Sequence, residues 1–197
     1  SLPFSQIPDD GSPINITSDS GRSAILQKIF SSSRRLKDLS TIYNGVKPFE
    51  KGKGKPPQTA RIVKEKPFVV EKRPKPEGEH WMPLLRGSLI HRYVILWNEN
   101  SWIKYGPWLA APRKRHIFDS KEKLLVRQTG DSIIATKCGD QFIARDNLHI
   151  VIPSSEVKIN FLLGILNSKV VDFAYGIINP EKGEALAQIK KRHVEEL

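Results

Sequence analysis

The chain has 197 residues, of which 39% are apolar and 8% aromatic, so it is long and apolar enough for one domain with its own core. Its 32 Lys and Arg residues outnumber 21 Asp and Glu, and the formal net charge of +11 favours a polyanionic partner, either nucleic acid or an acidic membrane surface. The single cysteine, Cys138, excludes a disulfide framework and a cysteine-rich zinc site within one chain.

The sequence predicts neither a membrane span nor a signal peptide. No stretch reaches the roughly 20 apolar residues that a span needs, since the most apolar run, residues 159–178, is interrupted by polar side chains. The first residues lack a basic region followed by an apolar one, and they are typical of a segment internal to a longer protein. We therefore expect a cytoplasmic location, a reducing environment for Cys138 and no membrane contact.

The first elements in chain order are a polar segment and a helix. Residues 1–20 are rich in Pro, Ser, Asp and Gly, which predicts a linker or a strap lying against an upstream catalytic domain. Capping residues at 18–20 and apolar residues at helical spacing predict a helix that ends at the serines 31–33. Residues 36–46 follow as a short turn and a strand, with a bend at Asn44-Gly45 because both residue types tolerate positive φ.

A long basic segment comes next. Residues 47–75 hold ten basic and three acidic residues, and therefore most of the excess positive charge of the chain. Proline recurs at positions 48, 56, 57, 67 and 74, which predicts a long exposed loop. We expect one strand within it, at residues 68–70, and we take the basic, Pro-rich loop to extend over 47–80.

The rest of the chain changes from strands to helices. Apolar residues follow helical spacing over 159–175, and Asn179-Pro180 is typical of the start of a last helix that closes at 190–192. Because strands do not alternate with helices, we expect an α+β fold with a mixed or antiparallel sheet, an N-terminal helix and two C-terminal helices, residues 157–197 being the helical end. Short runs of β-branched and aromatic residues predict the strands, at 88–96, 102–105, 123–128, 132–136 and 148–152.

The sequence shows no catalytic centre. The run Lys51-Gly52-Lys53-Gly54-Lys55 lacks the spacing and the strand–helix context of a phosphate-binding loop, and its lysines suit either phosphate contact or plain solvation. The five histidines form no metal pair at helical spacing, and His91 and His149 are expected to be ordinary sheet residues. Residues 156–158 resemble the acid-x-Lys step of a nuclease but lack a preceding Asp. We therefore expect no catalytic residue, no metal and no cofactor in this part of the protein.

Residues suited to nucleic acid are more numerous. Basic and aromatic side chains alternate through residues 86–108, and a compact cationic turn follows at 113–115. Arginine pairs bidentately with guanine edges, whereas lysine mainly meets phosphates. We expect the tryptophans at 97, 102 and 108 to anchor the core or loops. The candidate DNA-binding residues are Arg34, Arg35, Lys47, Lys51, Lys53, Lys55, Lys72, Arg73, Arg86, Arg92, Arg113, Lys114 and Arg115.

Four segments occur in an order and spacing shared with one protein family. They are residues 36–46, residues 83–93, the strand patterns between 123 and 151, and the run INFLLGILNSK at 159–169, which is the most telling. Together they resemble the C-terminal specificity domain, or target-recognition domain, of TaqI-like adenine-specific DNA methyltransferases and of related type IIG restriction-modification enzymes. The resemblance covers about residues 36–197.

The resemblance implies sequence-specific binding of double-stranded DNA by loops. It also implies an upstream adenine-N6 methyltransferase domain in the same chain, which uses S-adenosylmethionine and can be accompanied by an endonuclease. The Asn-Pro-Pro-aromatic motif that such enzymes use to hold the flipped adenine is missing here, and so is a glycine-rich cofactor motif. We therefore expect residues 21–197 to form a recognition domain without catalysis of its own.

Two other functions stay open. The resemblance extends to type I systems, in which recognition domains sit on a separate subunit, so the C-terminal helices here can serve as a protein-interaction module that docks catalytic subunits. An independent nuclease needs a cluster of acidic residues, which the sequence does not visibly offer.

Overall fold

The computed structural model describes residues 20–139, 141–179 and 188–197. The chain divides into two compact units, residues 1–34 and residues 35–197, which are described separately. In the first unit, helix α1 (Ser20–Ser31) confirms the expected helix. It ends where the hydroxyls of Ser32 and Ser33 donate hydrogen bonds to carbonyls of its last turn, at 2.8 and 2.6 Å. The expected boundary at residue 20 stays a prediction.

The second unit is built on a four-stranded antiparallel sheet whose two faces are both buried. Helix α2 (Leu36–Leu39) leads into its first strand, and the sheet has the order β1-β10-β7-β8. Successive side chains of a strand point to opposite faces, so Leu124 and Leu125 of β7 enter two different apolar cores. Burial on both sides explains why the two central strands, β7 and β10, are nearly continuous apolar runs. The strands are β1 (Ser40–Asn44), β7 (Lys123–Arg127), β8 (Ala135–Cys138) and β10 (Leu148–Pro153).

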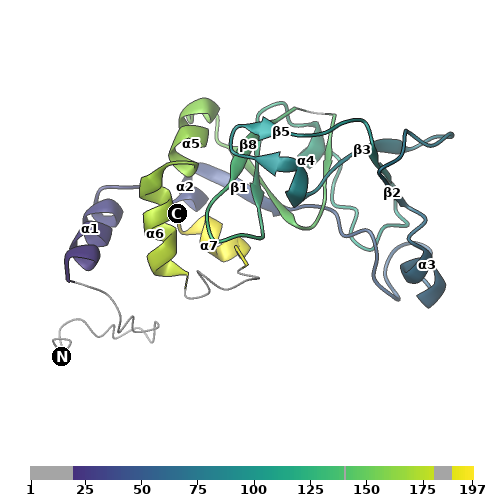
Figure 1. Cartoon of the computed structure of the whole chain (residues 1–197), viewed down its shortest axis with the longest axis horizontal. Coiled ribbons are helices and arrows are strands. Elements are labelled where there is room, and N and C mark those ends of the chain that lie inside the picture. Colours follow the sequence, from purple (N-terminus) through teal and green to yellow (C-terminus); the bar gives the residue numbers. More distant parts are fainter. Residues whose placement is uncertain (1–19, 140, 180–187) are drawn as a thin grey trace. The chain divides into compact units, whose positions relative to one another are not determined.

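Helices cover one face of this sheet (Figure 1). They are α5 (Ile159–Leu166), α6 (Lys169–Ile178) and α7 (Lys191–Glu195). The single helix expected over 159–175 is wrong in one respect, since it breaks at Asn167 and Ser168. The side chain of Asn167 exchanges hydrogen bonds with both backbone groups of Ala135, and the hydroxyl of Ser168 caps α6.

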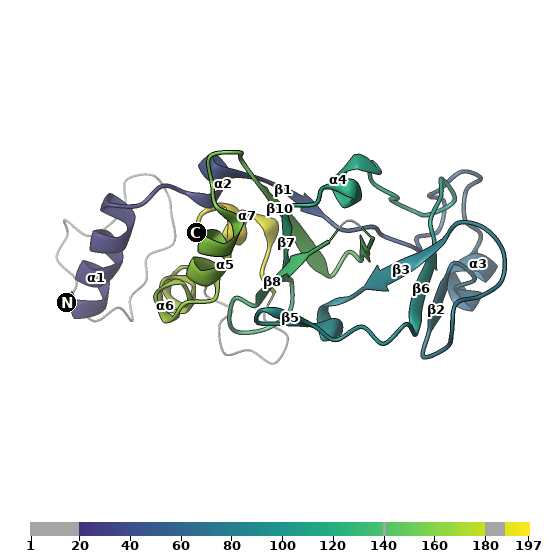
Figure 2. The ribbon, with the colours of Figure 1, turned by 90° about the horizontal axis from the view of Figure 1, so that it is seen from above.

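A second, mixed sheet lies on the other side and confirms the expected α+β class. Its order is β2-β6-β3-β9, in which β3 and β9 run parallel and the other pairs antiparallel. Figure 2 shows β2, β6 and α3 at the end of the unit opposite α5 and α6. The elements are α3 (Ala60–Glu65), β2 (Val69–Glu71), β3 (Trp81–Leu85), a 3-10 turn (Gly87–Leu89), the hairpin β4 (Ile90–His91) and β5 (Val94–Ile95), β6 (Ser101–Lys104), α4 (His116–Asp119) and β9 (Ile143–Ala144).

The basic segment is more ordered than its sequence indicates. Strand β2 confirms the expected strand within one residue, but helix α3 was not expected. The hydroxyl of Thr59 accepts a hydrogen bond from the N–H of Ile62 and so caps α3. Helix α3 is short and lies between prolines 57 and 67, which hid it in a proline-rich context.

The last helix starts later than expected. Residues 180–187, where it was expected to begin, lie outside the described residues. Gln188 pairs with Thr129, and the N–H of Ile189 donates to the carbonyl of Gln128, so the backbone is extended there. The expected helix is therefore wrong over 188–190, and α7 begins only at Lys191. None of the helices in the described part of the chain is both long and apolar enough to cross a membrane.

Candidate nucleic-acid interface

Two cationic segments that are far apart in the sequence lie side by side. Residues 47–58 and 105–115, called the paired loops below, are joined by backbone hydrogen bonds. Lys47 and Ala111 exchange both of theirs, at 3.0 and 2.9 Å, and the N–H of Lys55 donates to the carbonyl of Pro107 at 2.8 Å. The run of glycines and lysines at 51–55 and the turn at 113–115 therefore belong to one local structure.

A buried amide and a glycine hold the paired loops together. Gln58 is 3% exposed, and its side chain donates to the carbonyls of Pro48 and Trp108, both at 2.8 Å, while it accepts from the N–H of Glu50. A Cβ at Gly54 would lie 2.4 Å from the carbonyl oxygen of Trp108, and its φ of +88° also requires glycine. These residues fix the loop that carries the lysines.

The lysines of this loop differ in how free their charges are. Lys51, Lys53 and Lys55 are exposed, and none forms an ion pair with a described residue. Lys47 instead contacts Glu50 at 2.7 Å. This hydrogen-bonded pair raises the pKa of Lys47 and lowers the pKa of Glu50. The loop therefore presents three unneutralised cations and one neutralised pair.

The turn at 113–115 uses its arginines partly for its own structure. Arg113 has a φ of +62°, and its Nε donates to the carbonyl of Gly45 at 3.1 Å. The hydroxyl of Tyr105 donates to the carbonyl of Arg113, and burial raises the pKa of that hydroxyl. Arg115 lies 5.6 Å from the Tyr105 ring centroid and pairs with Asp119 at 2.7 Å. Lys114 is exposed and forms no ion pair with a described residue, so it presents its whole charge.

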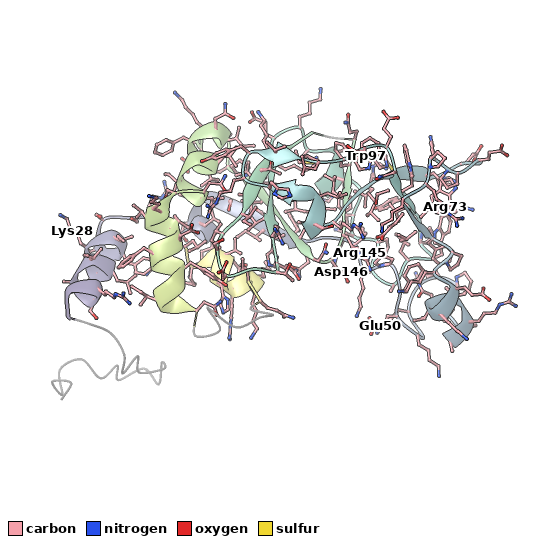
Figure 3. The ribbon with its side chains drawn as sticks, viewed as in Figure 1. Lys28, Glu50, Arg73, Trp97, Arg145 and Asp146 are labelled. Atoms are coloured by element: carbon pink, nitrogen blue, oxygen red, sulfur yellow. The ribbon has the colours of Figure 1, made fainter. Side chains whose placement is uncertain are left out.

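Two further candidates lie just after β2. Lys72 and Arg73 are exposed, and neither forms an ion pair within the described residues. Lys72 has a φ of +59°, and the N–H of Arg73 donates to the carbonyl of Asn100. Figure 3 shows Arg73 in the part of the unit that contains β2 and β3. These two cations follow a strand of the second sheet, as does the turn at 113–115, which comes after β6.

The remaining candidate residues, Arg34, Arg35, Arg86 and Arg92, lie outside the residue ranges of the paired loops. Arg92 pairs with Asp172 of α6 at 2.5 Å, and Arg35 donates to the carbonyl of Glu196 at 3.1 Å, just after α7. Arg86 pairs with Glu71 at 2.6 Å, and Arg34 belongs to the first unit. The guanidinium groups of Arg35, Arg86 and Arg92 are thus engaged within the protein, and a DNA contact at any of these four stays a prediction.

Sequence reasoning missed Arg145, which follows the short strand β9. Its guanidinium lies 3.4 Å from Glu71 and 3.5 Å from Asp146. The sequence shows no sign of β9, because a strand of two residues is too short to show an alternating pattern. Lys123 of β7 is 1% exposed although it is charged. Its ammonium donates to the carbonyls of Phe118 and Ser120 at 2.6 and 2.8 Å.

The reason given for glycine at position 45 is also wrong. Gly45 is not among the residues with positive φ, so backbone freedom does not explain it. A Cβ there would lie 2.2 Å from the carbonyl oxygen of Arg145, and this close approach leaves room for hydrogen only. Gly45 thereby joins the start of the paired loops to the end of β9.

The tryptophans anchor loops, as expected. The indole N–H groups of Trp97, Trp102 and Trp108 donate to backbone carbonyls three or four residues away, at 3.1, 3.0 and 2.9 Å. The ring of Trp97 also makes edge-on contacts with Trp102 and Phe142, each with centroids 5.2 Å apart. These rings are therefore engaged within the protein.

This combination of a two-sheet frame with cationic loops fits a domain that recognises nucleic acid. The chain belongs to the family of TaqI-like C-terminal specificity domains, whose pattern matches residues 82–197, more than half of its length. The match includes Arg113, Lys114, Arg115 and Arg145. It begins after the lysines of residues 47–58.

Individual relatives are more distant. A proposed type II restriction enzyme and methyltransferase of Methanocaldococcus jannaschii is 26% identical over 106 residues, which are 51% of this chain and 9% of that protein. The chain therefore spans about a tenth of that relative. A structure of a type I restriction-modification system has a TM-score of 0.47 at 10% identity, over 90% of this chain and 39% of the other. The HsdS subunit of Thermoanaerobacter tengcongensis has a TM-score of 0.38 at 10% identity, over 90% and 37%.

Proposed function

We propose that this chain is the DNA-recognition domain of a restriction-modification adenine-N6 DNA methyltransferase and has no catalysis of its own. The observation that carries the proposal is the pairing of residues 47–58 with 105–115 by backbone hydrogen bonds, which gathers exposed cations on one local structure. Membership of a specificity-domain family supports it, and so does the relative whose name joins a restriction enzyme to a methyltransferase.

Affinity and selectivity come from different side chains in this proposal. Lysines that neutralise phosphates release counterions and give salt-dependent affinity for any duplex. Arginines held in a fixed orientation choose base edges in the major groove. The catalytic domain of the parent enzyme then turns the target adenine out of the stack and methylates it with S-adenosylmethionine. The parent can also carry an endonuclease, and its location is the cytoplasm.

The salt dependence of duplex binding tests the proposal. Replacing Lys51, Lys53 and Lys55 together by Gln should weaken binding of a labelled duplex, measured by fluorescence anisotropy. The slope of log affinity against log salt should fall by about 0.9 for each phosphate contact that is lost. The matched control replaces Lys137, Lys158 and Lys169 by Gln, because these lysines are also exposed but lie on β8, at the N-cap of α5 and on α6.

Three outcomes would count against this function. Equal slopes for the two triple variants would remove the paired loops from the interface. Absence of duplex binding by the unmodified chain at low salt would overturn the proposal as a whole. Metal-dependent cleavage of DNA by the purified chain would favour the nuclease instead.

A second candidate function is docking of the catalytic domain, and the outer face of α5 favours it. Phe161 is 69% exposed, Ile165 is 41% exposed, and Val170 at the start of α6 is 56% exposed. Gly164 lies between the first two, and a Cβ there would meet nothing within 4 Å. This fold therefore does not need glycine at 164, and the missing side chain leaves room for a partner helix to approach closely. Replacing Phe161 by Glu should abolish co-sedimentation with the methyltransferase domain and leave duplex binding unchanged.

A further inference from the structure

Two arginines leave the second sheet side by side. Strands β3 and β9 are parallel, with Leu84 opposite Ile143 and Leu85 opposite Ala144. Arg86 and Arg145 are the next residues of the two strands, and the N–H of Arg145 donates to the carbonyl of Leu85 at 2.8 Å. The register of the sheet therefore places the two arginines next to each other, just beyond the carboxyl ends of two neighbouring strands.

One carboxylate holds both groups, but it holds them unequally. Glu71, the last residue of β2, contacts Arg86 at 2.6 Å through one oxygen and Arg145 at 3.4 Å through the other. Arg145 is also 3.5 Å from Asp146. The side chains of Arg86, Glu71 and Arg145 are 29%, 30% and 31% exposed. Arg86 is thus tightly bound, while Arg145 is oriented by two long contacts and keeps donors for another acceptor.

Arg145 stands at the base of the paired loops. Val46 forms a parallel bridge with Arg145, and Gly45 packs against its carbonyl oxygen. The guanidinium of Arg113 donates to the carbonyl of Gly45, so the turn at 113–115 is anchored at the same place. Figure 3 shows Arg145 and Asp146 next to each other, between Trp97 and Glu50 in the view.

A structural role alone does not account for this arrangement. Ion pairs with this much exposure contribute little to stability. A guanidinium, however, is the side chain best suited to bidentate pairing with guanine, and pre-orientation reduces the entropy that is lost on binding. The two carboxylates, Glu71 and Asp146, reduce the net positive charge of the cluster. The cluster is therefore better suited to selecting a base than to attracting phosphates in general.

We infer that Arg145 reads a guanine and that Glu71 is the positioning residue that orients it. The inference rests on the proposed function, because it names a base-reading residue within that interface. The lysines of the paired loops meet the phosphates on either side, and Arg145 enters the major groove between them. When DNA binds, Arg145 exchanges its long contacts for the O6 and N7 atoms of guanine, while Arg86 keeps Glu71 in place.

Base preference measured with a pool of duplexes that have a randomised central segment tests the inference. The unmodified 197-residue chain should enrich guanine at one position. Arg145→Lys keeps the charge but lacks the planar pair of donors, so it should lose roughly tenfold of that preference while the salt slope stays unchanged. Glu71→Gln should also weaken the guanine preference, and its binding to random duplexes should stay equal or rise because a negative charge is removed.

The exposed ion pair of α3 provides matched controls. Arg61→Lys and Glu65→Gln alter a pair at 2.7 Å within α3 and should leave base preference unchanged. An unchanged guanine preference in Arg145→Lys overturns the inference and leaves the proposed function intact. A uniform loss of affinity in both Arg145→Lys and Glu71→Gln, with base preference retained, assigns the cluster a structural role only. No duplex binding by the unmodified chain overturns both proposals.

Discussion

The two ends of the second unit are stabilised in different ways. The four-stranded sheet is held by apolar side chains on both faces, with Leu124, Leu125 and Ile150 fully buried. The paired loops are held by hydrogen bonds to Gln58 and by close approaches at Gly45 and Gly54. This separation suits a domain family whose members recognise different DNA sequences. Loop residues can change from one member to the next while the sheet stays folded.

The largest effect is expected at the apolar end. Leu125→Ala empties a fully buried position in β7, next to Leu148 and Ile150 in the same core, and should lower the free energy of unfolding by about 2–5 kcal/mol. Urea denaturation measures it. Leu96→Ala is the matched control, since Leu96 is 49% exposed and should change stability by less than about 0.5 kcal/mol. Similar losses for the two variants would mean that burial does not distinguish these sites.

A smaller and more local effect is expected at the loop end. Gln58→Ala leaves the carbonyls of Pro48 and Trp108 and the N–H of Glu50 without their side-chain partner, a loss of about 1–3 kcal/mol. Amide hydrogen exchange should speed up in residues 47–58 and stay unchanged in β7 and β10. Gln141→Ala, at an exposed glutamine, is the control. Equal acceleration in residues 47–58 and in strands β7 and β10 would show that the two ends unfold as one unit.

A pH effect is expected where the sheet meets the C-terminal segment. His149 of β10 is 1% exposed, with Nε2 2.7 Å from the carbonyl oxygen of Ile189, and burial lowers its pKa below the ordinary value. The unfolded chain therefore takes up a proton at a higher pH than the folded one does. Stability should fall as pH drops from the ordinary pKa toward the lowered one. The free energy of unfolding, measured by urea denaturation at a series of pH values, should depend less on pH over this range in His149→Gln. An unchanged pH dependence would show that His149 is not the group responsible.

The sequence predicted the apolar end better than the loop end, and the reason is physical. Strands β7 and β10 and helix α5 are marked by their own apolar residues, whose periodicity is local information. The break of the long helix at Asn167 was missed because it depends on hydrogen bonds to Ala135, a distant residue. The start of α7 was displaced in the same way, by the pairing of Gln188 with Thr129.

The candidate interface was predictable in composition but not in geometry. Lysines in a Gly- and Pro-rich run predicted one cationic loop, and the basic residues at 113–115 predicted a cationic turn. Their pairing depends on Gln58 and Trp108, which look ordinary in the sequence. Arg145 gave no signal, because its position follows from the parallel register of β3 and β9.

The smallest predicted change has the opposite sign and separates folding from docking. Glycine within a helix is less stable than alanine by roughly 0.5–1 kcal/mol, and a Cβ at Gly164 would meet nothing within 4 Å. Gly164→Ala should therefore raise the free energy of unfolding of the free chain by about that amount. If a partner helix packs on α5 between Phe161 and Ile165, the same methyl group should weaken docking, measured by co-sedimentation with the methyltransferase domain. If Gly164→Ala raises stability and docking is undiminished, no partner helix packs closely on this face of α5, because the added methyl group would have met it.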